Sequence, residues 1–175
     1  MNKIILSIPI FIILIISIFL FIFLLQEKNP TKPPSALLNE ELPKFSLVSL
    51  FDKTVTLSSL DVVNQITLIN FFASWCAPCK VEHPLFFKIK KKYLNLFILG
   101  IDMQDTNKDA IEFLTTDGNP YDYVGVDEQG LVGVEFGVIG LPETFVVNKD
   151  GKIIYKYLGP LTDKIIEDEI EPLLQ

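Results

Sequence analysis

The chain has 175 residues and a formal net charge of −7 at pH 7, with 22 acidic residues, 15 basic residues and one histidine. This length fits one domain of ordinary size. The acidic balance argues against nucleic acid and anionic membrane surfaces as partners, because both carry negative charge.

The stretch from Ile4 to Leu25 is an almost unbroken run of Ile, Leu and Phe. At about 1.5 Å per residue, a helix of this length would extend roughly 33 Å, enough to cross a bilayer. A cleaved signal peptide is the alternative, but its apolar core is usually shorter and a small-x-small cleavage site should follow. Gln26 and Glu27 follow instead, so we predict an uncleaved transmembrane helix at residues 4–25.

Lysines flank this segment on both sides, with Lys3 before it and Lys28 and Lys32 after it, so the positive-inside rule does not fix its orientation. Residues 26–36 are rich in proline, which predicts an extended, semi-rigid linker. We expect the folded domain at residues 37–175.

This domain alternates between strand and helix patterns. Strands are predicted at residues 45–49, 54–57, 65–72, 96–102, 144–148 and 152–157. Helices are predicted at residues 58–63, 81–93, 106–116, 129–136 and 162–174, with an interruption near Pro84. The order predicts an α/β fold with a mixed central sheet and helices on both faces.

Both cysteines lie in one motif, Cys76-Ala77-Pro78-Cys79, between a predicted buried strand and a predicted helix. Cys76 is expected at or near the helix N-cap, with Pro78 in the first turn, where a missing N–H costs nothing. The Cys76 sulfur would then face unpaired backbone N–H groups and the positive end of the helix dipole. Both favour a thiolate, the nucleophile of disulfide exchange. We expect Cys79 to be more shielded and to react second.

Three other interpretations of this pair are weaker. A purely structural disulfide over two residues closes too small a loop to restrain the unfolded chain much. A structural zinc site needs four ligands, and the chain offers two cysteines and one histidine, so no metal site is predicted. Covalent haem attachment needs a histidine where Lys80 stands. A redox-active dithiol without a further cofactor is the favoured interpretation.

Three segments together carry a resemblance to a known family. They are WCAPCKVEHP at 75–84, GNPY at 118–121 and GVIGLPETF at 137–145. They resemble the membrane-anchored thiol:disulfide interchange proteins of cytochrome c maturation, the DsbE (CcmG) family, which has a thioredoxin-like fold. Glu82 and the Pro-Glu-Thr-Phe string that begins at Pro142 are its most specific parts.

The resemblance implies a location and partners. Residues 1–3 would be cytoplasmic, and a single-pass inner-membrane anchor would hold the domain in the periplasm. A DsbD-type membrane thiol reductant would reduce the Cys76–Cys79 disulfide. The protein would in turn keep the CxxCH cysteines of apocytochrome c reduced for haem attachment, acting on apocytochrome c or on other maturation proteins.

The resemblance also assigns a substrate groove. In such proteins the proline equivalent to Pro142 is cis and faces the disulfide, so that the backbone of Leu141 meets a substrate strand. Ala77 and Pro78 would line the same groove. Without the resemblance, Pro142 could be an ordinary proline at the start of a strand.

The remaining site residues have two interpretations each. Glu82 and Glu143 are either solvated surface carboxylates or charges that tune the cysteines, because a nearby carboxylate raises a thiol pKa. Trp75 is expected to be packed and to shape the rim of the site. His83 is expected at the surface and is given no role.

Two alternative functions stay open. One is a reductase for another periplasmic target, such as a copper-site assembly protein. The other is a binding module that uses the groove at Pro142 to tether maturation partners without turnover.

Overall fold

The computed structural model describes the backbone of residues 3–25 and 37–174 and the side chains of residues 8–22 and 37–174. The chain divides into two compact units, residues 1–30 and 31–175. The predicted linker at residues 26–36 lies outside the described residues.

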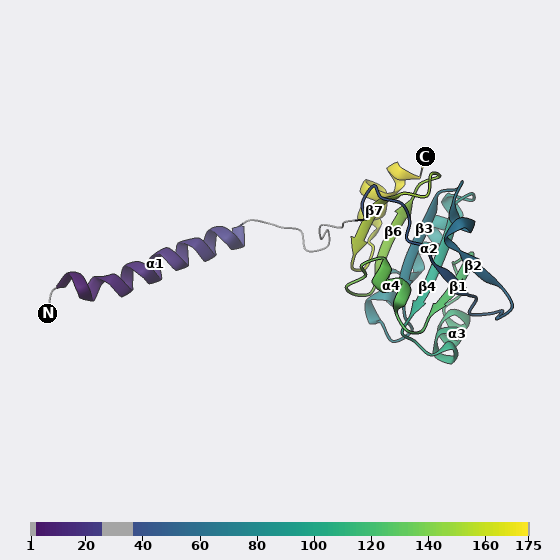
Figure 1. The fold of residues 1–175 in the computed structure, drawn as a ribbon, viewed down its shortest axis with the longest axis horizontal. Helices are drawn as coiled ribbons and strands as arrows, with labels where there is room; N and C mark the ends of the chain where they lie inside the picture. The colour runs from purple at the N-terminus through teal and green to yellow at the C-terminus, as the bar shows by residue number, and fades with distance from the viewer. Residues whose placement is uncertain (1–2, 26–36, 175) are drawn as a thin grey trace. The chain divides into compact units, whose positions relative to one another are not determined.

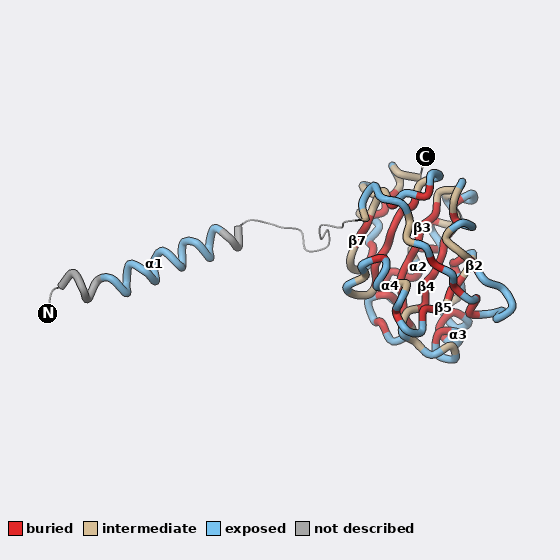
Figure 2. Tube along the Cα trace, in the orientation of Figure 1, coloured by how far each residue is buried: buried red, intermediate tan, exposed pale blue. Residues whose placement is uncertain are grey.

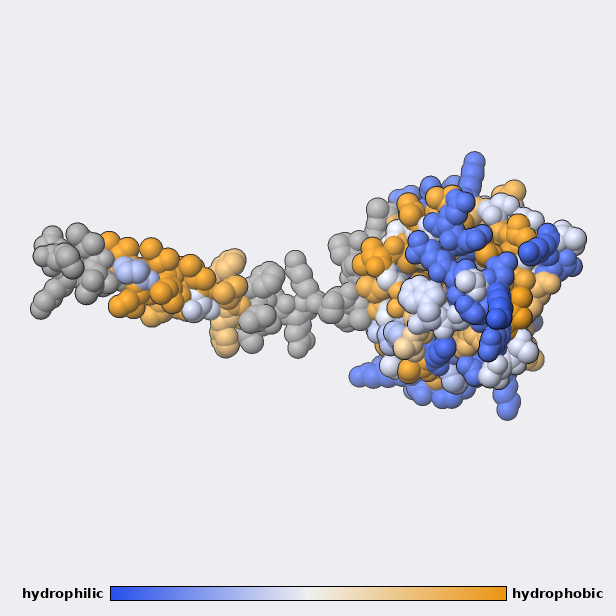
Figure 3. Space-filling view, turned by 90° about the horizontal axis from the view of Figure 1, so that it is seen from below, coloured by the Kyte–Doolittle hydropathy of each residue, from blue (hydrophilic) through white to orange (hydrophobic). Residues whose placement is uncertain are grey.

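In the first unit, the structure describes one helix, α1 (Lys3–Leu25), which contains Pro9. Its described side chains are exposed and almost all hydrophobic (Figure 3). Among the residues that the structure describes, no helix is both long enough and apolar enough to cross a membrane.

The second unit is built on a mixed five-stranded sheet with the strand order β5-β4-β3-β6-β7 (Figure 1). The three strands β3, β4 and β5 run parallel, and β6 and β7 are antiparallel to their neighbours. A separate antiparallel pair is formed by β1 and β2. The strands are β1 (Ser46–Val48), β2 (Thr56–Ser58), β3 (Thr67–Phe72), β4 (Phe97–Met103), β5 (Tyr123–Asp127), β6 (Glu143–Val147) and β7 (Ile153–Leu158).

Helical segments cover both faces of this sheet. They are η1 (Ser59–Val62), α2 (Ala77–Lys92), α3 (Asn107–Thr116), α4 (Leu131–Glu135), α5 (Asp163–Ile165), η2 (Ile166–Ile170) and η3 (Glu171–Leu173). The predicted α/β class with a mixed sheet is confirmed, and the predicted strands agree with the structure within two residues at each end.

The alternation of side chains along β3 divides the core in two. Leu68 and Phe72 point into a cluster beneath α2, α3 and the C-terminal helical segment. Ile69 and Phe71 point into a second cluster beneath η1, α4 and the β1–β2 pair. The central strands are therefore buried on both faces, as Figure 2 shows.

Strand β5 was not predicted. Its residues lie parallel to β4, with Gly100 opposite Val124 and Ile101 opposite Gly125. A glycine in the middle of a short apolar run weakens the strand pattern. Here Gly125 is required because β1 packs too closely against it to leave room for a side chain. A Cβ atom at position 125 would lie 2.6 Å from the Cβ atom of Leu47 in β1.

Two helix predictions were also wrong in detail. The interruption expected near Pro84 is absent: α2 starts directly after its N-cap Cys76, as expected, and continues through Pro84. Burial of Phe86 and Ile89, beyond the proline, favours continuation of the helix. The C-terminal segment is capped by Thr162, as predicted, but it passes from α-helix to π-helix and ends as a 3-10 turn at Pro172, which has no backbone N–H to donate.

Candidate active site

The two cysteines lie at the junction of β3 and α2 and are joined by a disulfide bond. Cys76 is the N-cap of α2, and its sulfur accepts a hydrogen bond from the backbone N–H of Cys79 at 3.2 Å. Pro78 lies in the first turn. The predicted N-cap geometry is therefore present, and it would stabilise a thiolate on Cys76 in the reduced form.

The expected difference in shielding between the two cysteines is absent. Cys76 is 4% exposed and Cys79 is 3% exposed in this disulfide form. Their positions on the helix do differ, because Cys76 is the N-cap and Cys79 lies in the first turn.

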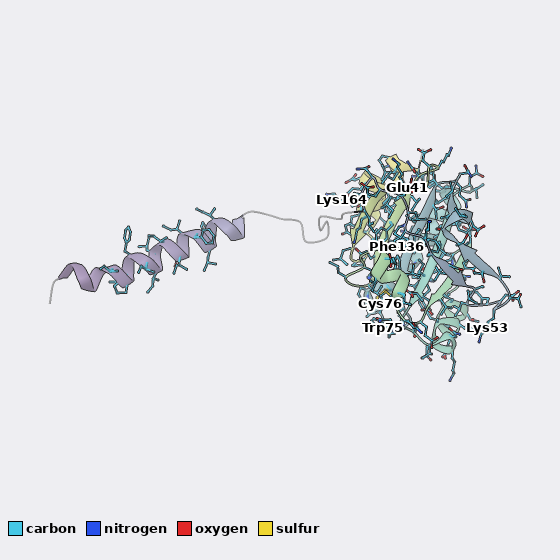
Figure 4. The ribbon with its side chains drawn as sticks, viewed as in Figure 1. Glu41, Lys53, Trp75, Cys76, Phe136 and Lys164 are labelled. Atoms are coloured by element: carbon cyan, nitrogen blue, oxygen red, sulfur yellow. A yellow bond between two sulfur atoms is a disulfide. The ribbon has the colours of Figure 1, made fainter. Side chains whose placement is uncertain are left out.

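Trp75 projects from the rim of the site instead of packing into the domain. It is 61% exposed, and its indole N–H donates to the carbonyl of Gln104 at 3.1 Å. The preceding residue, Ser74, donates its backbone N–H to the carboxylate of Asp105 at 2.5 Å. These contacts tie the active-site loop to the segment after β4. Figure 4 shows Trp75 and Cys76 at the same end of the domain, far from the labelled Glu41.

A groove of about 280 Å³ lies beside Trp75. Its other lining residues are Met103, Gln104, Val138, Ile139, Gly140 and Leu141. The Leu141–Pro142 bond at its edge is cis, as expected. Ala77 and Pro78, at the start of α2, are exposed.

Glu82 is buried rather than solvated. It is 1% exposed, one helical turn after Cys79 on α2. One carboxylate oxygen accepts from the Asn70 side-chain amide at 2.8 Å, and the other accepts from the Leu161 backbone N–H at 2.7 Å. Asn70 also accepts from the Tyr121 hydroxyl at 2.8 Å. Burial raises the pKa of Glu82 to about 7, although these two hydrogen bonds to the carboxylate lower it.

Glu143, next to the cis proline, is also buried rather than solvated. Its carboxylate forms an ion pair with the Lys156 ammonium at 2.9 Å, and its second oxygen accepts from the Ile139 backbone N–H at 3.2 Å. Burial raises the pKa of Glu143, and Lys156 opposes that shift. The two glutamates lie on opposite faces of the sheet, because Glu143 shares its face with Phe145 in the second core cluster.

The comparisons with known proteins agree with this geometry. A family model described as Redoxin matches residues 37–173. The thiol:disulfide interchange protein HelX of Rhodobacter capsulatus is 39% identical over 152 residues, which cover 87% of this chain and 85% of the relative. The thiol:disulfide interchange protein DsbE of Pseudomonas aeruginosa is 35% identical over 175 residues, which cover 100% of this chain and 95% of the relative. The chain belongs to the DsbE (CcmG) family of thiol:disulfide interchange proteins.

Solved structures share the fold of this DsbE-family chain. A secreted thiol-disulfide isomerase from Corynebacterium glutamicum matches with a TM-score of 0.68 and 25% identity, over 76% of this chain and 84% of that one. A DsbF homologue from Corynebacterium diphtheriae matches with a TM-score of 0.70 and 18% identity, over 84% and 95% of the two chains. The DsbE-family chain is therefore a thiol-disulfide oxidoreductase with a thioredoxin-like fold.

His83 was expected at the surface of this DsbE-family chain, and that prediction is wrong. His83 is 3% exposed, its Nε2 atom lies 2.8 Å from the Gly118 carbonyl oxygen, and its ring packs against Phe113. Burial lowers the pKa of His83. The side chain therefore joins α2 to the loop after α3, which carries the GNPY motif.

Two buried charged residues near the site were missed. Asp102 is fully buried at the end of β4, and neither carboxylate oxygen has a hydrogen-bond donor among the described residues. Burial, with the nearby Asp105, raises the pKa of Asp102 to about 8. The second buried charged residue is Lys156, in β7. The signal in the sequence was a charged residue inside an otherwise apolar strand, in both β4 and β7.

Among the described residues, no group of three or more His, Cys, Asp or Glu side chains is arranged to hold a metal ion.

Proposed function

We propose that the protein is a periplasmic reductant in cytochrome c maturation that keeps the CxxCH cysteines of apocytochrome c reduced for haem attachment. The observation that carries the proposal is the disulfide of Cys76 and Cys79 at the N-terminus of α2, beside a groove that ends at a cis Pro142. Membership of the DsbE (CcmG) family supports the choice of pathway.

In the proposed reaction, the reduced protein donates two electrons. The Cys76 thiolate attacks one sulfur of the substrate disulfide, forms a mixed disulfide and releases the first substrate thiolate. The Cys79 thiolate then attacks the Cys76 sulfur and releases the second. The substrate thiolates take up two protons, and the protein is left with the Cys76–Cys79 disulfide seen in the structure. A membrane thiol reductant of the DsbD type supplies the next electron pair.

The other site residues take supporting roles in this proposal. The backbone of Leu141 pairs with the substrate strand, and Trp75, Ala77 and Pro78 border the groove. Glu82 tunes the two thiols. The carboxylate of Glu143 supports the groove from behind through its bond to Ile139.

We also propose that the apolar segment at residues 4–25 anchors the chain in the inner membrane as a single span, with the domain in the periplasm. The apolar sequence and the family resemblance support this part.

A deletion strain tests the proposed function. Cells without the protein should lack covalently haem-bound c-type cytochromes and make other periplasmic proteins normally, because an oxidising compartment closes the haem-site thiols into a disulfide. A small thiol added to the medium should partly restore maturation, since it supplies electrons without specific recognition. Haem staining of separated proteins provides the measurement.

Each alternative function predicts a different result. Normal c-type cytochromes together with a defect in copper-site assembly would favour a reductase for another periplasmic target. A cytochrome defect that no thiol relieves would favour the binding module, because a tether cannot be replaced by electrons.

A further inference from the structure

Lys156 is a buried lysine in β7, and the proposed reaction does not use it. Its side chain is 6% exposed, and three groups surround its ammonium. The Glu143 carboxylate forms an ion pair with it at 2.9 Å, the Gly137 carbonyl accepts a hydrogen bond from it at 2.8 Å, and the Phe145 ring lies 5.2 Å away.

Two of these partners connect Lys156 to residues that line the groove. Gly137 is the residue before Val138 and Ile139, which line the groove. Glu143 follows Pro142, and its second carboxylate oxygen accepts the backbone N–H of Ile139. Lys156 therefore holds the wall of the groove, residues 137–141, at Gly137 directly and at Ile139 through Glu143.

Within residues 37–174, few other hydrogen bonds restrain the backbone of this wall on the side of the sheet. The backbone N–H groups of Gly137 and Val138 donate back to α4, to Val134 and Gly133. In this described part of the chain, the bonds to Lys156 and Glu143 are those that connect the wall to the strands β6 and β7. Burying two charges is costly, and an apolar pair could often stabilise a core equally well. The side chain of Ile139 itself is 69% exposed.

We infer that Lys156 is a positioning residue that sets the shape of the substrate groove, with Glu143 as the link between them. This inference rests on the proposed groove at Leu141, but it does not depend on which protein is the substrate. It predicts that Lys156 affects the capture of a peptide substrate and leaves the intrinsic reactivity of Cys76 unchanged.

The experiment compares two substrates of the reduced full-length protein in mild detergent. One is a disulfide-bonded peptide that contains CxxCH, and the other is a small aromatic disulfide that needs no groove. Lys156→Met should lower the second-order rate constant for the peptide about tenfold or more, because a displaced groove misaligns the substrate strand. The rate constant for the small disulfide should stay within about twofold.

Matched variants control this comparison. Lys156→Arg, which keeps the charge, should retain most of the rate constant for the peptide. Lys88→Met removes an exposed lysine that pairs with Asp163 and should change neither rate. If Lys156→Met does not fold, because Glu143 is left buried and unpaired, the double variant Lys156→Met with Glu143→Gln removes both charges and should show the same selective loss.

Ile139→Ala separates failure of the inference from failure of the groove. If Ile139→Ala slows the peptide and the Lys156 variants do not, the positioning role is wrong and the groove stands. If neither variant slows the peptide, the groove and the inference are both wrong. Parallel loss of both rates in the Lys156 variants would mean a general structural role and would overturn the inference.

Discussion

Two carboxylates on the α2 face of the sheet set the electrostatics behind the disulfide. Burial raises the pKa of Glu82 to about 7 and that of Asp102 to about 8. Burial and both of these charges raise the pKa of the Tyr121 hydroxyl. The two carboxyl groups change protonation in the pH range in which thiols ordinarily ionise, so they affect the reaction and the stability of the domain.

Glu82→Gln should make both thiols easier to ionise. The carboxylate is mostly ionised above its pKa of about 7 and lies one helical turn from Cys79, so it opposes a thiolate there. Without it, the midpoint of thiolate formation should fall by roughly half a unit to one unit. Thiolate absorbance of the reduced protein measures this midpoint. Curves that overlay for the two proteins would remove Glu82 from the mechanism.

Asp102→Asn should stabilise the domain at neutral and alkaline pH. The unfolded carboxyl group releases its proton near its ordinary pKa of 3.8, whereas the folded one keeps it up to about 8. Stability therefore falls as pH rises between these values in the natural protein, and Asn removes this loss. The variant should gain about 2 kcal/mol or more by pH 8 and nothing below pH 3.8.

Denaturant unfolding at several pH values measures this difference. Asp150→Asn, at an exposed position in the hairpin between β6 and β7, is the control and should show no pH-dependent gain. A constant difference at all pH values would contradict the raised pKa.

Cys79→Ser should accumulate mixed disulfides with substrate proteins, because the thiol that resolves them is gone. Cys76→Ser should accumulate few, since Cys76 is the N-cap that receives the backbone N–H. Electrophoresis without reductant, after acid trapping, shows the adducts. Faster alkylation of Cys79 than of Cys76 in the reduced protein would reverse the assignment.

At the scale of elements, the strand-turn-helix unit from β3 to α2 could be predicted because its signals are local. An apolar run, a cap and a proline in the first turn lie next to one another in the sequence. Strand β5 could not be predicted in this way. Its glycine is explained only by Leu47, which lies far away in the chain and in a different sheet.

Gly125→Ala tests this explanation of β5. The added methyl group would meet the Leu47 side chain at 2.6 Å, and the bridge between Ser49 and Gly125 limits how far β1 can move. The variant should lose about 1–3 kcal/mol of unfolding free energy. Gly140→Ala is the control, because the nearest side-chain atom there is 3.6 Å away. Equal stability of the Gly125 variant and the natural protein would contradict the close packing.

At the scale of the whole molecule, burial of polar groups was the feature that sequence could not supply. The sequence left Glu82 as either a solvated carboxylate or a charge that tunes the cysteines, and it could not show that the backbone N–H of Leu161, far along the chain, donates to it in the core. The burial of Glu143 could not be predicted either, because its ion-pair partner, Lys156, lies on the neighbouring strand β7. The motifs identified which residues belong to the site, but their environments depend on partners that only the folded sheet brings together.

The N-terminal segment provides the last test at this scale. If residues 4–25 form an uncleaved anchor, the full-length chain should stay in the membrane pellet after carbonate extraction at high pH. After mild reduction of intact spheroplasts, a membrane-impermeant maleimide should label the protein, and the Cys76→Ser variant should be labelled less. Mass spectrometry should find residues 1–25 still attached. A shorter, carbonate-soluble form would instead mean a cleaved signal peptide. Labelling only after lysis would place the domain on the cytoplasmic side, where the proposed role in haem attachment fails.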